Sequence, residues 1–204
     1  MFTGNRRHQG YVLEIVKIAI RVRSGDGSGG SFRIRKACRP QRINHIMTGE
    51  HESDLVSMIV PAYNAERHIG FTIDSLTSQS HANLEIIVVD DGSTDRTLEI
   101  ASEHAESDDR ITVITQHNLG VATARNRALE VITGDFVGFV DADDIWHPNA
   151  VKKMLSRFEG SSPDLGVVYT WSSDIDEDNR AIGGGHASRA RGHVHPLLIV
   201  HNFL

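Results

Sequence analysis

The sequence has little of several features that define whole classes of protein. Its 204 residues include one cysteine, Cys38, which excludes an intramolecular disulfide framework and is typical of a reducing compartment. The longest apolar candidate, residues 11–22, is broken by charged side chains and is shorter than the roughly 20 residues that span a bilayer. No small-residue cleavage site follows it, so we expect no Sec-type signal peptide. These absences predict a cytoplasmic protein.

Two phosphate-binding glycine motifs are also missing. No Gly-x-Gly-x-x-Gly follows a strand-like segment, and Gly-x-x-x-x-Gly-Lys-Ser/Thr does not occur. This argues against a hydride-transferring Rossmann enzyme and against a P-loop NTPase. A protein of this sequence that binds a diphosphate therefore needs another counter-charge.

Charge is distributed unevenly along the chain. Residues 1–46 hold ten lysines and arginines against two acids, whereas residues 47–204 hold eleven against 25. A basic arm on an acidic body is one sign of contact with nucleic acid or with a membrane surface. The Ser/Gly-rich run at 24–31, the lack of periodicity and Met47 favour another interpretation. We expect residues 1–46 to be a disordered extension or a mis-assigned start, and we expect no nucleic-acid partner.

From residue 55 onward, apolar runs alternate with helical patterns. Such alternation predicts a mainly parallel sheet with helices on both faces, in three layers. The predicted strands are residues 55–60, 84–89, 111–115, 136–140 and 165–171, with the first ended by Pro61. Three predicted helices are residues 65–78, 120–131 and 148–158. Another helix follows residue 95 and is expected to bury Leu98, Ala101 and Ala105.

The pattern weakens after residue 171. Residues 174–179 resemble a polar hairpin tip, and 183–185 a flexible turn. Residues 197–204 are mostly apolar and resemble the start of a buried element. We therefore expect the domain, residues 47–204, to be incomplete at its C-terminal side.

Polar clusters follow three of the predicted strands, at residues 61–64, 90–93 and 141–144. Ligands of open α/β sheets bind beyond the carboxyl ends of the strands, so these clusters are expected at one edge. Two clusters are acidic, and carboxylates are ligands that suit Mg²⁺ or Mn²⁺. The alternatives are structural: Asp144 could cap the helix near Pro148, and Asp90 or Asp95 could cap the second predicted helix, the one that follows residue 95.

Four segments together resemble the successive motifs of glycosyltransferase family 2. They are residues 56–64 (VSMIVPAYN), 89–95 (VDDGSTD), 120–126 (GVATARN) and 141–144 (DADD). The resemblance spans residues 54–171 in order and spacing. It implies a three-layer, Rossmann-like GT-A fold and an inverting hexosyltransferase.

The resemblance also implies roles for residues that would bind a nucleotide-sugar donor. Pro61 and Tyr63 would line the base and ribose, and Asp91 would accept a hydrogen bond from the base, usually uracil. Arg125 would lie near the diphosphate or stabilise the acidic loops. For Arg125, an ordinary ion pair on a helix face is the alternative.

The acidic cluster would hold the metal. Asp143 would be the chief ligand in an Asp-x-Asp (DXD) motif, and Asp141 would face the ribose and the metal. In a loop, both carboxylates can approach one ion, which would stabilise the departing diphosphate.

The implied reaction moves a sugar from a UDP-sugar to a hydroxyl of a saccharide or lipid-linked acceptor, in polysaccharide or glycolipid synthesis. We expect it in the cytoplasm, with peripheral association at the inner face of the membrane as a second expectation. Inversion needs a general base. No Asp or Glu follows Asp178, so this base is expected beyond Leu204.

Two other functions compete with transfer. One is a fragment that binds nucleotide and metal but lacks the base. The other is a sugar nucleotidyltransferase, which is disfavoured because no glycine-rich basic loop lies near the first strand. His193 and His195 form a weaker candidate metal pair, for which a polar loop is the simpler interpretation.

Overall fold

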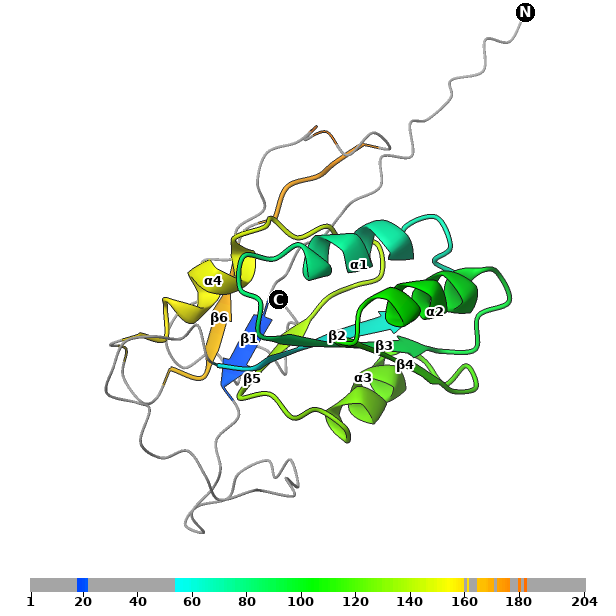
Figure 1. Cartoon of the computed structure of the whole chain (residues 1–204), viewed down its shortest axis with the longest axis horizontal. Coiled ribbons are helices and arrows are strands. Elements are labelled where there is room, and N and C mark those ends of the chain that lie inside the picture. Colours follow the sequence, from blue (N-terminus) through cyan, green and yellow to red (C-terminus); the bar gives the residue numbers. More distant parts are fainter. Residues whose placement is uncertain are drawn as a thin grey trace, which may run out of the picture. The chain divides into compact units, whose positions relative to one another are not determined.

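The computed structural model describes residues 54–159, 161, 165–170, 172–176, 180 and 182, together with the backbone of residues 18–21. The chain divides into two compact units, residues 17–169 and residues 1–16 with 170–204. The first unit contains a six-stranded sheet (Figure 1). Its strands are β1 (Ile18–Arg21), β2 (Val56–Ala62), β3 (Leu84–Asp90), β4 (Ile111–Thr115), β5 (Phe136–Phe139) and β6 (Val167–Tyr169). Its helices are α1 (Ile69–Thr77), α2 (Thr97–Ser107), α3 (Val121–Leu129) and α4 (Ala150–Leu155).

The sheet has the strand order β4-β3-β2-β5-β1-β6. The four strands β4, β3, β2 and β5 run parallel, and β1 pairs antiparallel with both β5 and β6. Because β2 and β3 are covered on both faces, they read as continuous apolar runs rather than as alternating ones. The predicted α/β class with a mainly parallel sheet is confirmed.

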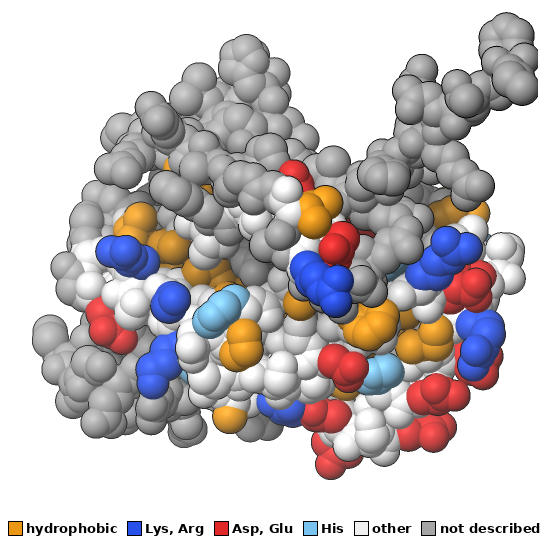
Figure 2. All heavy atoms as spheres, turned by 90° about the horizontal axis from the view of Figure 1, so that it is seen from above, with side chains coloured by type: hydrophobic (Ala, Val, Ile, Leu, Met, Phe, Trp, Pro, Cys, Tyr) orange, Lys and Arg blue, Asp and Glu red, His pale blue; other side chains and the backbone are white. Residues whose placement is uncertain are grey.

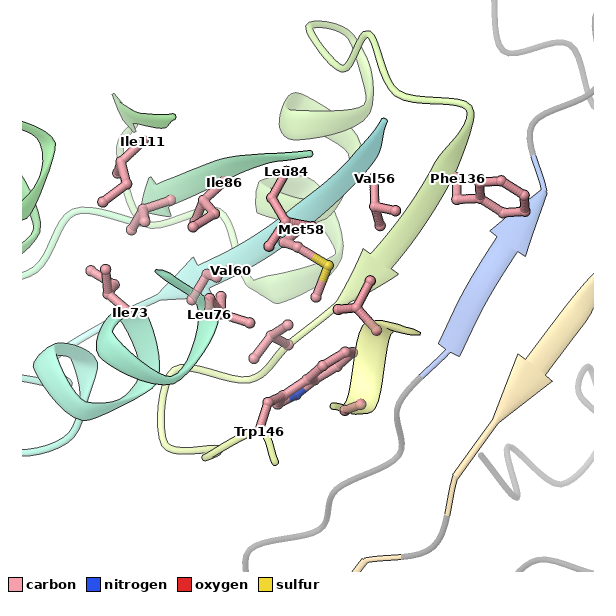
Figure 3. Packing of buried hydrophobic residues seen from close by; sticks show 14 of the residues in the cluster. Val56, Met58, Val60, Ile73, Leu76, Leu84, Ile86, Ile111, Phe136 and Trp146 are labelled. Carbon is pink, nitrogen blue, oxygen red and sulfur yellow. The ribbon is translucent and has the colours of Figure 1, made fainter. Parts of the chain in front are cut away.

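Helices cover both faces of this sheet (Figure 1). Alternate residues of β2 separate the two cores, because successive side chains point to opposite faces. Met58 and Val60 pack with residues of α1, α2 and α4, and Figure 3 shows this cluster around Leu76 and Trp146. Ile59 packs with Ala124 and Ala128 of α3 on the other face. The helical spacing of apolar residues in the sequence thus matches the two buried faces, except at Leu98, which was expected to be buried and is exposed.

Two boundaries differ from the predicted ones. β2 does not end before Pro61, which pairs with Val89 inside the strand. Pairing of β2 with β5 stops at Ile59, so one side of β2 has no ladder partner at Pro61. A residue without an N–H is tolerated there. α1 begins at Ile69 rather than at Ala65, because a turn precedes it in which the amides of His68 and Ile69 both bond to the Ala65 carbonyl.

The structure describes four residues of the basic extension. Ile18–Arg21 form β1, which lies between β5 and β6 in the sheet. The expectation for residues 1–46 as a whole stays a prediction, and the strand is described for these four residues alone. A strand here is favoured because the edge of β5 would otherwise present unpaired backbone groups. The rest of residues 1–46 lies outside the described part of the chain.

In the second unit, the backbone reverses direction between residues 174 and 182. The Asp176 amide donates to the Arg180 carbonyl at 2.9 Å, and the Ile182 amide donates to the Asp174 carbonyl at 3.0 Å. These paired bonds are of the kind that flank a hairpin turn, and residues 177–179 of the predicted tip lie outside the described part of the chain. The predicted features at 183–185 and 197–204 lie outside the described residues.

The surface of the described residues carries charges of both signs. On the face seen in Figure 2, acidic, basic and apolar side chains are interspersed, which is typical of a solvated surface. No helix within the described residues is long and apolar enough to cross a membrane.

Candidate functional site

The three predicted polar clusters lie at one edge of the sheet. β2, β3 and β5 run parallel (Figure 1), so the segments after Ala62, Asp90 and Phe139 all leave the sheet at its carboxyl edge. This is the edge at which open α/β sheets bind ligands. The structure therefore brings these segments together as the sequence predicts.

The loops after β2 and β3 are joined by Asn64. Its amide donates to the Ser93 hydroxyl at 3.0 Å, and its side-chain oxygen accepts from the Thr94 amide at 2.8 Å. Asn64 has a φ of 49°, in the left-handed region that asparagine tolerates better than most residues. The two loops therefore form one structure, which the sequence did not reveal because these partners are about 30 residues apart.

A second contact between the same loops centres on Asp95. Its carboxylate accepts from the Thr97 amide at 3.0 Å and from the Glu66 amide at 3.1 Å. Burial acts to raise the pKa of Asp95, but hydrogen bonds from the hydroxyl and amide of Thr97 and from the Glu66 amide outweigh it and lower the pKa. Asp95 is not the N-cap of α2, which is Arg96, but its carboxylate does bind the amide of Thr97, the first residue of that helix.

Asp91 is buried and accepts three hydrogen bonds. The Gln116 side chain donates at 2.8 Å, the Leu119 amide at 2.9 Å and the Gly120 amide at 2.8 Å. Burial acts to raise the pKa of Asp91, but these three bonds outweigh it, so the pKa lies below its ordinary value and the group is ionised at neutral pH. The Asp91 carboxylate thus holds the β4–α3 loop. Gln116 was missed by the sequence analysis, since no local pattern links it to Asp91.

Gly92 makes this arrangement sterically feasible. It has a φ of 73°, and a Cβ at this position would lie 2.9 Å from the Asn118 amide nitrogen. Both the backbone conformation and the close approach require glycine. The loops after β3 and β4 are therefore tightly fitted against each other beside Asp91.

The two residues expected to line a base and ribose differ in exposure. Pro61 is buried inside β2. Tyr63 follows the strand, and 49% of its surface is exposed at the carboxyl edge. Of this pair, Tyr63 is the side chain available to a ligand, and Pro61 contributes to the path of the strand that presents it.

Arg125 of α3 forms an ion pair with Asp141. Its Nη2 donates to Asp141 Oδ1 at 2.7 Å, and its guanidinium carbon lies 5.8 Å from the centre of the Phe139 ring. The two charged side chains are 37% and 51% exposed, so solvent screens the pair and it contributes little to stability. The pair joins α3 to the acidic turn rather than two residues on one helix face, and it places Arg125 beside that turn.

The acidic segment is a turn rather than a continuation of the strand. β5 ends at Phe139, and the Asp144 amide donates to the Asp141 carbonyl at 3.0 Å. Asp141 and Asp143 are exposed, whereas Asp144 is buried. Asp144 does not cap α4, whose N-cap is Asn149.

Asp143 differs from its neighbours in having no hydrogen bond or ion pair within the described part of the chain. Among those residues, no group of three or more His, Cys, Asp or Glu side chains could hold a metal ion. Two carboxylates nevertheless fit Mg²⁺ or Mn²⁺, because such ions often bind one or two protein carboxylates and take other oxygens from phosphate and water. The residues present therefore fit a metal that binds together with a diphosphate. His193 and His195 lie outside the described residues.

The comparison with protein families decides the identity of the chain. A family model described as glycosyl transferase family 2 matches residues 57–199, well over half of the sequence. The chain belongs to glycosyl transferase family 2. This membership and the mainly parallel sheet confirm the expected GT-A fold class.

Curated relatives of this family member include synthases of polysaccharides. It is 35% identical to chondroitin synthase of Escherichia coli, covering 73% of this chain and 22% of the relative. It is 32% identical to hyaluronan synthase of Pasteurella multocida, covering 73% and 15% respectively. Glycosyltransferase GlyA of Streptococcus pneumoniae is 40% identical over 61% of this chain and 18% of its own length. The chain thus spans about a fifth of the length of these relatives.

Solved structures with similar sequences also exist. S. aureus TarS in complex with UDP is 35% identical, covers 52% of this chain and 32% of its own, and superposes with a TM-score of 0.48. A mannosyltransferase from Pyrobaculum calidifontis in complex with GDP-Man and Mn²⁺ is 31% identical, covers 53% and 32%, and also gives 0.48. Because both TM-scores lie below 0.5, the fold assignment rests on the family match and the sheet.

Proposed function

We propose that this family 2 chain binds a UDP-sugar and a divalent metal ion at the carboxyl edge of its sheet. The bound sugar is a hexose that is transferred with inversion to a hydroxyl of a saccharide or lipid-linked acceptor, in polysaccharide or glycolipid synthesis. One observation carries the proposal: the buried, ionised Asp91 and the exposed Asp141 and Asp143 lie at the same edge. Nucleotide-sugar chemistry and the single cysteine favour the cytoplasm. A lipid-linked acceptor would be met at the inner face of the membrane.

The nucleotide would bind on the side of β2 and β3. Tyr63 offers an exposed aromatic ring for the base. The Asp91 carboxylate already accepts three hydrogen bonds, and a carboxylate has about four acceptor positions, so one remains for an N–H of the base. Because the other three bonds fix its orientation, Asp91 would select a base that presents a donor at that point.

The diphosphate would bind toward the acidic turn. Asp143 and Asp141 would hold the metal, with Asp143 as the chief ligand because it has no competing partner among the described residues. When bound, the metal would neutralise the diphosphate and stabilise it as a leaving group. Arg125 lies 2.7 Å from Asp141 and would add a positive charge near the same phosphates.

In the transfer, the acceptor oxygen forms a bond to the anomeric carbon while the bond from that carbon to the diphosphate breaks. The diphosphate leaves with the electron pair, and a general base takes the acceptor proton. Asp141 and Asp143 are assigned to the metal, so this base is a different carboxylate. It remains a prediction that it lies beyond Leu204.

Calorimetry of the full chain tests the proposal. We expect UDP to bind more tightly with Mn²⁺ than with EDTA, and Asp143→Ala to remove most of that gain. Asp109→Ala is the control, because Asp109 is an exposed acid that precedes β4 at the opposite edge. Unchanged UDP binding in EDTA and in Asp143→Ala would falsify the metal assignment. Tighter binding of GDP than of UDP would contradict the assigned base.

Binding without transfer is the second candidate function. It is favoured by the lack of any Asp or Glu after Asp178. The two functions separate when UDP release from UDP-sugars is measured with and without saccharide acceptors. Acceptor-dependent release supports transfer, whereas tight binding with no release supports binding alone.

A further inference from the structure

Helix α1 carries a buried polar stripe beside its buried apolar one. Its apolar residues Ile69, Ile73 and Leu76 face the sheet. Thr72 and Ser75, together with Gln79 just after the helix, follow at spacings of three and four and are also buried. Buried polar side chains are costly unless they are hydrogen-bonded, so the partners of this stripe are informative.

The first member of the stripe contacts the acidic turn directly. The Thr72 hydroxyl donates to the Ala142 carbonyl at 2.8 Å. Ala142 stands between Asp141 and Asp143, the two proposed metal ligands. Fixing this carbonyl fixes the peptide plane that leads into Asp143, and so the position from which its carboxylate extends.

The other two members hold the chain that follows the turn. The Ser75 hydroxyl accepts from the Trp146 amide at 3.0 Å. The Gln79 side chain donates to the His147 carbonyl at 2.9 Å and accepts from the Val151 amide at 3.1 Å. The Trp146 ring is itself buried in the core beside Leu76 (Figure 3), so the downstream end of the turn is held by packing as well.

We propose that Thr72, Ser75 and Gln79 are positioning residues that orient the acidic turn for metal binding. This inference rests on the proposed function. Four hydrogen bonds from one helix face reach the backbone between residues 142 and 151. An apolar face would cover the same segment without fixing its carbonyl and amide directions. The polar stripe therefore sets the geometry of a site whose own carboxylates are exposed and weakly constrained.

The test uses Thr72→Val in the full chain, because valine keeps the shape and removes the donor. Partners behind metal ligands typically change metal affinity by 10–100-fold. We expect the gain in UDP affinity caused by Mn²⁺ to fall about tenfold, while UDP affinity in EDTA stays unchanged. Thr72→Ser restores the hydroxyl and should recover the gain. Thr77→Val is the matched control, because the Thr77 hydroxyl donates at 3.2 Å to Asp74 within the same helix.

Amide hydrogen exchange gives a readout that does not depend on the metal. Exchange in a peptide covering residues 140–151 should rise in Thr72→Val and not in Thr77→Val, with peptides from β2 and β3 unchanged. Near-UV circular dichroism checks folding. If Thr72→Val does not fold, Ser75→Ala replaces it, because that change removes the bond to the Trp146 amide.

The outcomes distinguish failure of the positioning role from failure of the proposed function. If exchange in residues 140–151 is unchanged in Thr72→Val, the positioning role is overturned. If Asp143→Ala abolishes the Mn²⁺ gain but Thr72→Val leaves it intact, the positioning role fails and the proposed function stands. If Asp143→Ala itself has no effect, the proposed function fails and the inference falls with it. Faster exchange together with a reduced Mn²⁺ gain supports both.

Discussion

Two carboxylates at the same edge of the sheet are held in opposite ways. Asp91 is buried and accepts bonds from Gln116, Leu119 and Gly120. Asp143 is exposed and has no partner within the described residues. Both lie in segments that resemble family 2 motifs, yet their surroundings differ. The Asp91 carboxylate organises loops through three internal donors and keeps about one acceptor position for a ligand, whereas Asp143 has no internal donor among the described residues.

This contrast predicts that substitutions have different effects on the nucleotide side of the site (β2, β3 and their loops) and on the acidic side (residues 141–144). The nucleotide side is organised in advance by bonds between its loops. On the acidic side, hydrogen bonds from α1 hold the backbone of the turn, while the carboxylates of Asp141 and Asp143 are exposed and could bind an ion. Substitutions on the nucleotide side should change the free energy of unfolding as well as binding of the base. Substitutions on the acidic side should change binding of the metal and the diphosphate with little effect on stability.

The largest expected effect on stability comes from Asp91→Ala. It leaves one side-chain and two backbone donors without their charged acceptor. These donors belong to half-buried or exposed residues, so water can replace part of the lost bonding. We expect a loss of about 1.5–3 kcal/mol in the free energy of unfolding, the range for a hydrogen bond to a charged group, measured by urea denaturation. Asp143→Ala is the matched change on the exposed side and should stay within about 0.5 kcal/mol of the original chain. Equal losses in the free energy of unfolding for Asp91→Ala and Asp143→Ala would contradict the proposed difference between the two carboxylates.

Gly92→Ala should destabilise the same side to a lesser degree. Alanine at a φ of 73° adopts an unfavourable backbone conformation, and its Cβ would press on the Asn118 amide. The conformational cost alone is about 1–2 kcal/mol. Gly166→Ala provides a comparison, because Gly166 has no positive φ and a Cβ there would meet no described atom within 4 Å. Gly92→Ala should therefore lower the melting temperature more than Gly166→Ala.

The pH dependence of stability should also distinguish the two carboxylates. The folded-state pKa of Asp91 lies below its unfolded value, so the unfolded chain binds more protons between the two values. Its contribution is fully present above the unfolded pKa of about 3.9 and is lost as the pH falls toward the folded pKa. Urea denaturation between pH 3 and 6 should show a shallower acid-side slope in Asp91→Asn than in Asp143→Asn.

Arg125→Met, like Asp143→Ala, should have only a small effect on stability. Its half-exposed ion pair with Asp141 contributes about 0–1 kcal/mol. Removing Arg125 also removes a competitor of the metal for Asp141. Binding of Mn²⁺ alone should therefore become tighter while binding of UDP with Mn²⁺ becomes weaker. If binding of Mn²⁺ alone and binding of UDP with Mn²⁺ both become weaker, Arg125 supports the acidic turn rather than competing with the metal for Asp141.

Much of the scaffold was predictable from the sequence because it depends on local patterns. The apolar runs of β2 and β3 and the spacing of Ile69, Ile73 and Leu76 predicted their elements within a few residues. The parallel arrangement then predicted that the polar clusters share one edge. Family roles for individual residues remain predictions until a ligand is bound.

The contacts within the site were not predictable in the same way. Asn64 with Ser93, Gln116 with Asp91 and Thr72 with Ala142 join residues 25–70 positions apart. Each is a single polar side chain without a periodic signal, so only the fold reveals its partner. β1 was not predicted, because a four-residue strand in a short apolar stretch interrupted by charges has no clear period and depends on the neighbouring strands for its structure.

A crystal structure of the full chain with UDP and Mn²⁺ tests the central assignment most directly. The anomalous signal of Mn²⁺ locates the ion without reference to the protein coordinates. We predict Mn²⁺ coordinated by Asp143 and by oxygens of the diphosphate, with the uracil beside Tyr63 and Asp91. A diphosphate bound away from residues 141–143, or Mn²⁺ with no ligand from Asp141 or Asp143, would contradict it.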